Sequence, residues 1–137
     1  MRLPQLLRRR KPDTHKGDYS HILILAGSRC FSGAGVLCAE AALRAGAGLV
    51  TLALPESLNN PVIKIKPREI ITRPLPETGE GSVSMQAYPM LSRLLKTVDV
   101  LAVGPGLSGN AETQTLIRKL VQNAHVELVA DAAGVVH

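Results

Sequence analysis

The stretch Thr14-His15-Lys16-Gly17-Asp18-Tyr19-Ser20-His21-Ile22-Leu23-Ile24-Leu25-Ala26-Gly27-Ser28 decides the fold of this chain. It passes from a polar lead-in to an apolar strand and a Gly-Ser turn, and a second turn at 32–35 opens a helix of small residues. A strand, a glycine-rich turn and a helix in this order place backbone N–H groups at the carboxyl edge of a sheet, where α/β proteins bind phosphates and nucleotides. The same order returns at residues 98–109, so the sequence predicts two loops that could converge on one ligand.

The rest of the chain alternates between strand-like and helix-like segments. Strands are predicted at 21–26, 49–54, 98–103 and 126–130, and helices at 33–45, 84–96 and 111–123. The proline-rich residues 55–82 are predicted to form a long connection with two short extended pieces, at 62–66 and 69–72. Repeated β-α alternation predicts an α/β domain with a doubly wound, mostly parallel sheet and helices on both faces, in a strand order that the alternation does not define.

The first loop does not carry either of the common nucleotide-binding signatures. Residues 27–33 lack the Gly-Lys-Ser/Thr ending of a Walker A loop and do not have the Rossmann spacing. Five segments instead resemble, in order, the NAD(P)H-hydrate dehydratases, which are repair enzymes with a ribokinase-like fold that use ADP or ATP to dehydrate damaged, hydrated NADH and NADPH. The segments are His15-Lys16-Gly17-Asp18-Tyr19, Ala26-Gly27-Ser28 with Gly33-Ala34, Ala41-Ala42-Leu43-Arg44-Ala45-Gly46-Ala47-Gly48-Leu49-Val50, Gly104-Pro105-Gly106-Leu107 and Val129-Ala130-Asp131-Ala132.

The resemblance implies how the chain is organised. Residues 1–14 are a basic lead-in, and residues 15–137 correspond to the N-terminal part of the family's domain. The sequence does not contain the family's later segments, which are a Thr-Pro-His-Pro-Gly-Glu-like stretch, a Lys-Gly nucleotide loop and a Gly-Thr-Gly-Asp-like turn with the catalytic aspartate. We therefore expect a lyase that is inactive as this chain alone, and we assign no catalytic residue. ADP or ATP, with Mg²⁺ as a candidate ion, is implied as the cofactor, although its main binding loop is missing.

The same resemblance implies partners. The small-molecule ligand is hydrated NAD(P)H, and the protein partner is either further copies of this chain or a complementary C-terminal half. If the family's sheet is cut after strand 126–130, that strand becomes an exposed apolar edge, and such edges pair with other chains. We therefore expect the chain to form oligomers or to aggregate.

Five candidate substrate-binding residues lie in the two loops. Ala34 is in the first turn of the first helix, where a small side chain leaves room and exposes helix N–H groups. Gly106, together with Gly104, would let a ligand approach backbone that any Cβ would block. Ser28 and Gly33 flank the first turn, and the Ser28 hydroxyl could donate to a phosphate or cap the helix.

Three further candidates lie at the ends of the matched region. His15 and Lys16 belong to the lead-in and could face the ligand. Asp131 ends the last strand at the edge where functional carboxylates collect, and it is a candidate for ligand contact rather than a general base. At this place the family often has a second Asp and an Asn, which are replaced here by Ala133 and Val136.

Composition and charge argue against several classes of protein. The 137 residues suffice for one core, and the longest apolar run is shorter than the ~20 residues that a membrane span requires. Residues 1–16 hold six basic residues and one acid, whereas the remaining ten bases and ten acids balance, so we predict no nucleic-acid-binding face. Cys30 and Cys38 are too few for a zinc site and indicate reduced thiols in a cytoplasmic protein.

Two alternative functions stay open at this point. Gly104-Pro105-Gly106-Leu107-Ser108-Gly109 is literally G-x-G-x-x-G, and Asp131 follows at the end of the next strand, as in a Rossmann-type dinucleotide-binding oxidoreductase. Pro105 stiffens this loop and removes one amide donor, which weakens that interpretation. The other alternative is a non-catalytic binding or oligomerisation domain on the same fold.

Overall fold

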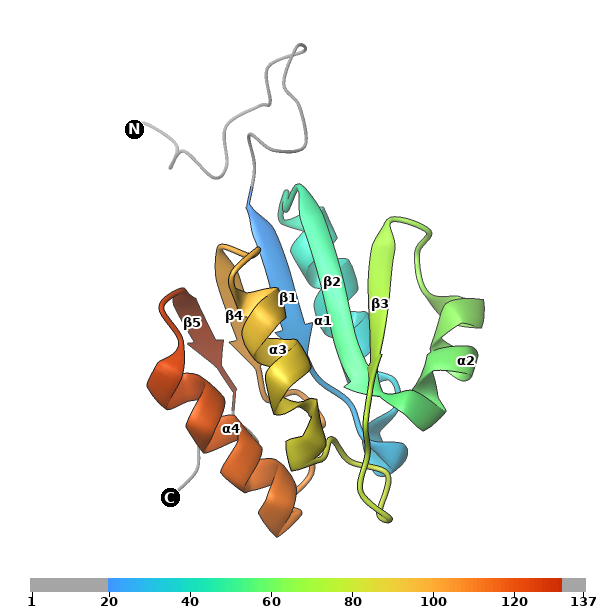
Figure 1. Ribbon diagram of the computed structural model, residues 1–137. Coiled ribbons are helices and arrows are strands. Elements are labelled where there is room, and N and C mark those ends of the chain that lie inside the picture. Colours follow the sequence, from blue (N-terminus) through green and yellow to red (C-terminus); the bar gives the residue numbers. More distant parts are fainter. Residues whose placement is uncertain (1–19, 132–137) are drawn as a thin grey trace.

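The computed structural model describes residues 20–131. Its centre is a five-stranded sheet in the order β3-β2-β1-β4-β5, in which all neighbouring strands are parallel (Figure 1). The strands are β1 (His21–Leu25), β2 (Leu49–Pro55), β3 (Ile70–Leu75), β4 (Val100–Val103) and β5 (Glu127–Ala130). The predicted parallel α/β architecture is confirmed, and the structure supplies the strand order.

A layer of helices lies on each face of the sheet, which makes the fold doubly wound. The helices α1 (Ala34–Arg44) and α2 (Glu56–Ile65) cover one face, and α3 (Tyr88–Leu95) and α4 (Ala111–Asn123) cover the other. Successive side chains of a strand point to opposite faces, so β1 sends Leu23 and Leu25 into the core beneath α3 and α4 and sends Ile24 into the core beneath α1. Burial on both faces explains why this strand is a continuous apolar run.

One sequence prediction about the elements is wrong. Residues 62–66 were expected to be extended, but residues 56–65 form α2. Leu58 and Val62 lie one helical turn apart, and both are buried in the core beneath α1 and α2. Their burial outweighs the hydrogen bond that Pro61 removes from the inside of this helix. The extended piece expected at 69–72 is β3, which continues to Leu75.

The remaining helices follow the predictions closely. Pro89 was expected to limit how early the 84–96 helix becomes regular, and the structure has a 3₁₀ turn, η4 (Met85–Ala87), followed by α3 from Tyr88. The α4 helix has the predicted bounds. Its cap, Asn110, accepts hydrogen bonds from the N–H groups of Glu112 and Thr113 at 3.0 and 3.1 Å.

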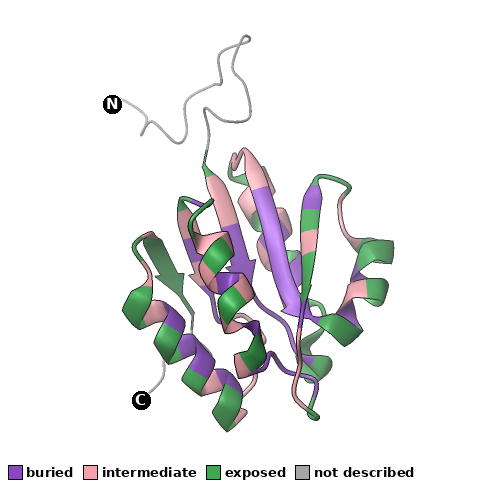
Figure 2. Cartoon of the chain, in the orientation of Figure 1, coloured by how far each residue is buried: buried purple, intermediate pink, exposed green. Residues whose placement is uncertain are grey.

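The two edges of the sheet differ in how well they are covered. All four residues of β5 are exposed, and Figure 2 shows this strand in green beside the buried centre of the sheet. The expectation that strand 126–130 would be an exposed edge is confirmed. Within residues 20–131, no helix is long and apolar enough to cross a membrane.

Candidate functional site

The candidate site lies between two neighbouring strands whose following connections lead to opposite sides of the sheet. After β1 the chain passes through α1 to β2 on one side, and after β4 it passes through α4 to β5 on the other side. Because β1 and β4 are neighbours, the loops that follow them meet at the carboxyl edge of the sheet (Figure 1). This divergence is the place where open α/β sheets bind ligands.

The two predicted loops do converge, and a main-chain hydrogen bond joins them. The N–H of Gly27 donates to the carbonyl of Pro105 at 2.8 Å. Gly27, Gly104 and Gly106 all have positive φ angles, of 90°, 131° and 70°, which side-chain-bearing residues rarely adopt. These glycines therefore allow the bends that bring the loops together.

The structure gives a different reason for the glycine at position 106 from the one expected. A Cβ built on Gly106 would lie 2.8 Å from the Cβ atoms of Ala34 and Phe31 and 3.0 Å from the carbonyl oxygen of Phe31. The protein itself therefore fills the space that a ligand was expected to use. Ala34 and Gly106 are in contact, as two residues of one site would be, and this contact packs the start of α1 against the β4–α4 loop.

The N-terminus of α1 is open to ligands. Gly33 is the N-cap residue, and no side chain caps this helix end. A Cβ added at Gly33 would meet no atom within 4 Å, and Gly33 is exposed. The first N–H groups of a helix have no partner inside the helix and attract anions. This end of α1 can therefore receive a phosphate or another anionic group.

Ser28 does not have the surroundings that were expected for a phosphate donor. Its side chain is 2 % exposed, and its Oγ has no hydrogen-bond partner among residues 20–131. It does not cap α1. An unpaired buried hydroxyl destabilises the fold, and Ser28 can reach a ligand only if the 27–33 loop shifts.

The other candidates are placed as follows. Asp131 is exposed at the end of β5, and its N–H donates to the carbonyl of Val103 at 3.0 Å. Burial, and secondarily the charge of Asp131, raises the pKa of the Cys38 thiol. The Asp131 carboxylate therefore acts on the flank of α1 that carries Cys38. His15 and Lys16 lie outside the described residues.

Sequence reasoning missed a third wall of the site, the 76–84 loop. Arg29, in the 3₁₀ turn η3 (Arg29–Phe31), donates from its N–H to the carbonyl of Gly81 at 2.9 Å and from Nη1 to the carbonyl of Gly79 at 3.4 Å. A Cβ on Gly81 would lie 2.7 Å from the Arg29 side chain. η3 is thus held between Gly81 on one side and Gly106 on the other.

A buried polar cluster joins the same loop to α4. The hydroxyl of Thr113 donates to the carbonyl of Val83 at 2.8 Å, and its oxygen lies 2.9 Å from Ser82 Oγ. At the surface beside this cluster, Asn110 donates from Nδ2 to Glu80 Oε2 at 3.0 Å. The Gly79-Glu80-Gly81 turn was the signal in the sequence, but nothing there showed which element the turn would contact.

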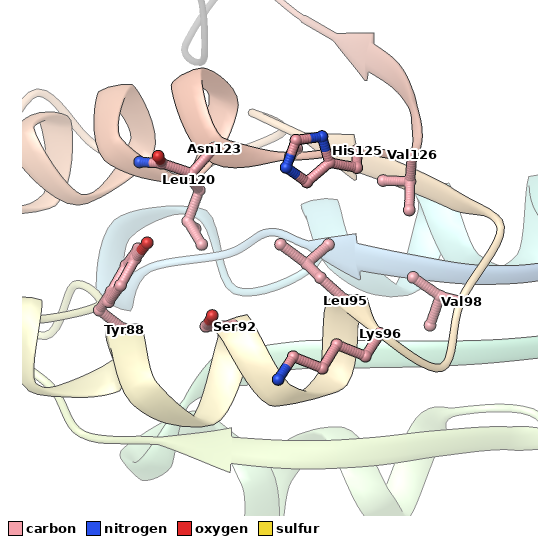
Figure 3. Close-up of a pocket in the computed structure, with 10 residues that line it drawn as sticks. Tyr88, Ser92, Leu95, Lys96, Val98, Leu120, Asn123, His125 and Val126 are labelled. Carbon is pink, nitrogen blue, oxygen red and sulfur yellow. The ribbon is translucent and has the colours of Figure 1, made fainter.

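Two cavities lie toward the opposite end of the sheet. One, of about 350 Å³, opens between α3 and the C-terminal part of α4, where the side chains of Tyr88, Ser92 and Leu95 face those of Leu120 and His125 (Figure 3). Another, of about 470 Å³, lies beside the end of α1. Both cavities include residues at the edge of the sheet where the strands begin, so neither belongs to the site at the carboxyl edge. Among residues 20–131, no group of three or more His, Cys, Asp or Glu side chains could hold a metal ion.

Comparisons with known proteins identify relatives of the chain. A family model described as NAD(P)H-hydrate dehydratase matches residues 22–137. The bifunctional NAD(P)H-hydrate repair enzyme Nnr of Moorella thermoacetica is 44% identical over 126 residues, which are 92% of this chain and 24% of that protein. The ADP-dependent (S)-NAD(P)H-hydrate dehydratase of Listeria monocytogenes is 31% identical over 93% of this chain and 43% of its own length. The chain therefore spans less than half the length of these relatives.

Two solved structures share the fold of this chain. The ADP/ATP-dependent NAD(P)H-hydrate dehydratase of Bacillus subtilis, co-crystallised with ATP and Mg²⁺, superimposes with a TM-score of 0.72 at 25% identity, over 93% of this chain and 42% of that one. A ribokinase-like superfamily protein of Enterococcus faecalis shares the fold, with a TM-score of 0.70 at 23% identity over 88% of this chain and 39% of its own. From the family match over residues 22–137, the chain belongs to the NAD(P)H-hydrate dehydratase family.

Proposed function

We propose that this chain forms the substrate-side part of an ADP- or ATP-dependent NAD(P)H-hydrate dehydratase, a lyase that repairs hydrated NADH and NADPH. The main support is the pair of loops joined by the hydrogen bond from Gly27 to Pro105 beside the open N-terminus of α1. A dinucleotide carries a diphosphate, and the uncapped N–H groups of a helix are suited to bind it. Family membership supports hydrated NADH or NADPH as the dinucleotide.

In this proposal the residues of the chain bind and orient the substrate. The N–H groups after Gly33 hold an anionic part of the substrate. The rigid contact between Ala34 and Gly106 fixes the position of α1 relative to the β4–α4 loop. Asp131, at the end of β5, is a further contact candidate. Gly104, Ser28, His15 and Lys16 remain candidates of the same kind, and no residue is proposed to transfer a proton.

ADP or ATP is proposed as the cofactor from family membership alone. ADP or ATP, when bound, supplies a phosphoryl group that turns the substrate hydroxyl into a leaving group. The 137 residues do not include the family's Lys-Gly nucleotide loop or its Gly-Thr-Gly-Asp-like turn, and residues 20–131 contain no group of three or more His, Cys, Asp or Glu side chains that could hold a metal ion. We therefore assign no residue of this chain to the nucleotide or to Mg²⁺.

We also propose a cellular compartment and a kind of protein partner for this chain. The cysteines Cys30 and Cys38 are both free thiols, which supports a reducing compartment such as the cytoplasm. Either further copies of the chain or a complementary C-terminal part would complete the site. The exposed β5 strand supports association of one of these kinds.

The test is to add hydrated NADPH to the purified chain, with and without ADP or ATP. We expect the substrate to bind and to shift the backbone amide NMR signals of residues 33–36, 104 and 106–109. We expect no return of the dihydronicotinamide absorbance, because the catalytic segments are missing. Turnover by the chain alone would contradict the proposal that it is only the substrate side.

Other outcomes would favour the alternative functions. Tighter binding of ordinary NADH than of its hydrate, together with hydride transfer, would favour the oxidoreductase interpretation, which the comparisons do not favour. The absence of binding to any of these dinucleotides would favour a non-catalytic domain. Gly33→Asp provides a matched negative control, because its Cβ would meet no atom within 4 Å, while its carboxylate would cap the start of α1 and repel an anionic ligand.

A further inference from the structure

The cavity of about 350 Å³ between α3 and the C-terminal part of α4 lies away from the candidate substrate site. One face of α3 forms its first wall, because Tyr88, Ser92 and Leu95 are spaced four and three residues apart on this helix. Residues 123–126, which connect α4 to β5, close the other side. All of the lining residues lie between positions 88 and 126, so every wall belongs to the described part of the chain.

The floor of the cavity is apolar. Leu120 and Val98 are 1% and 8% exposed and belong to the core beneath α3 and α4. Leu95 and Val126 are partly buried against the same core and form the flanks. The volume lies at the lower end of the range of small-molecule sites, which is about 300–1,000 Å³. The cavity is therefore suited to the hydrocarbon part of a small ligand, which leaves water favourably.

Three polar side chains bring hydrogen-bond donors to the cavity. Figure 3 shows the hydroxyls of Tyr88 and Ser92 extending from α3 toward α4, and the ring of His125 lying across the cavity from them. None of these three side chains forms a hydrogen bond with another residue among 20–131. Each carries an O–H or an N–H, so all three can donate to one ligand group. The group that satisfies all of them is rich in acceptors.

The charge at the cavity has one sign. Lys96 and His125 are among the lining residues, whereas no aspartate or glutamate is among them. Beside the cavity, Lys119 places its Nζ 4.1 Å from the centroid of the Tyr88 ring and adds a second ammonium group. The carbonyls at the C-terminal ends of α3 and α4 carry only partial negative charge, which these full charges outweigh. The acceptor-rich group is therefore an anion.

We infer that this cavity binds a small aromatic molecule that carries one carboxylate. A carboxylate offers two oxygens that only accept, which matches the three donors. The aromatic ring packs on the apolar floor beside the ring of Tyr88, and Lys96 supplies the opposite charge. This inference does not depend on the proposed function, because the cavity and the candidate substrate site lie toward opposite ends of the sheet.

Three probes with the same ring and nearly the same size test the choice of ligand. Benzoate is an anion, benzamide is neutral and benzylamine is a cation, and each is titrated into the full 137-residue chain while the backbone amide NMR signals are followed. We expect benzoate to shift the signals of residues 92–98 and 120–126. We expect it to bind about tenfold more tightly than the other two, because charge-assisted hydrogen bonds are about twice as strong as neutral ones.

Two results of this titration would overturn the inference. If benzamide or benzylamine binds in the cavity as tightly as benzoate, the ligand is not a carboxylate. If benzoate at about 20 mM shifts none of these signals, the cavity is not a site, because a Kd of about 1 mM would leave it almost fully occupied.

Variants on α3 and at its end test the charge and the donors separately. Lys96→Gln should weaken benzoate binding about threefold, as expected for an exposed ion pair. Arg93→Gln is the matched control, because Arg93 is also an exposed base but does not line the cavity, and it should change nothing. Ser92→Ala suits a helix, so the chain should fold, and it should weaken benzoate about tenfold through the lost donor. Affinity equal to that of the Arg93→Gln variant in either of the other two would overturn the inference.

Discussion

At the scale of the residue, Gly106 is the position where sequence and structure give different reasons for the same amino acid. The sequence suggested room for a ligand, but the Cβ atoms of Ala34 and Phe31 occupy that side. A glycine in a loop indicates that a Cβ is not tolerated. It does not reveal whether the obstacle is a ligand or the protein, because that depends on a helix far away in the sequence.

Gly106→Ala should destabilise the fold by about 1–3 kcal/mol, because its Cβ would meet Ala34 and Phe31 at 2.8 Å and its φ is 70°. Urea unfolding gives the free energy of unfolding. Gly109→Ala is the matched control, since its Cβ would meet nothing within 4 Å, and it should change stability by less than about 0.5 kcal/mol. Equal effects of the two substitutions would show that the contact is unimportant.

The reactivity of Cys38 reports on Asp131. Burial, and then the charge of Asp131, raises the pKa of this thiol, so that less of it is thiolate at a given pH. Removing the charge with Asp131→Asn should lower the pKa and speed the alkylation of Cys38 at mildly alkaline pH, because the thiolate is the nucleophile. Mass spectrometry distinguishes Cys38 from the exposed Cys30, whose rate should not change. An unchanged rate at Cys38 would mean that the carboxylate lies too far away.

At the scale of the element, sequence reasoning succeeded where one segment determines its own structure. The α4 helix carries its N-cap, the helical spacing of its apolar residues and its C-terminal end within one continuous stretch, and its bounds were predicted correctly. Residues 62–66 were predicted wrongly because Ile63-Lys64-Ile65 alternates like a strand, while the pair that decides the outcome is Leu58 and Val62. Only contact with β2 and β3 makes that pair dominant.

Val62→Ala should therefore destabilise the fold by about 1–3 kcal/mol, since Val62 is 2% exposed in the core beneath α2. Ile63→Ala, at a residue that is 50% exposed, should cost less than about 0.5 kcal/mol. Chemical denaturation measures both. If α2 were the strand that its alternation suggests, Ile63 and Ile65 would be equivalent to each other and Val62 would be the tolerant site.

The cap of α4 also secures the third wall of the site. Asn110→Ala removes the acceptor for two helix N–H groups and the donor to Glu80, and it should cost about 1–2 kcal/mol. Thermal denaturation is the measurement. Asn123→Ala is the control, because Asn123 is exposed at the other end of α4 and bonds only to the carbonyl of Lys119 among the described residues. A smaller loss at Asn110 than at Asn123 would contradict this role.

At the scale of the whole molecule, the sequence predicted the fold class, the family and the meeting of two loops. The order of strands could not be predicted, because alternation of strands and helices does not determine on which side each new strand is added. The role of the 76–84 loop could not be predicted either, because no local pattern shows which distant elements a loop will contact. Its contacts with Arg29 and with Thr113 span long distances in the sequence.

Local stability should decrease from the centre of the sheet to β5. The β1 residues Leu23, Ile24 and Leu25 are fully buried, whereas all residues of β5 are exposed. Hydrogen exchange should therefore be slowest in β1, which opens only with global unfolding, and much faster in β5, which can open alone. Exchange measured peptide by peptide by mass spectrometry checks this order. Uniform protection across the sheet would show that β5 unfolds only with the rest of the domain.

The hydrogen bond between Gly27 and Pro105 has a consequence for variation within the family. Both of its atoms belong to the main chain, so a side-chain replacement at position 105 does not in itself remove it. Members that keep the glycines at these bends can differ at other loop positions and retain the same spacing between the two loops. Substrate preference can then diverge through side chains alone, while the frame that supports them stays constant.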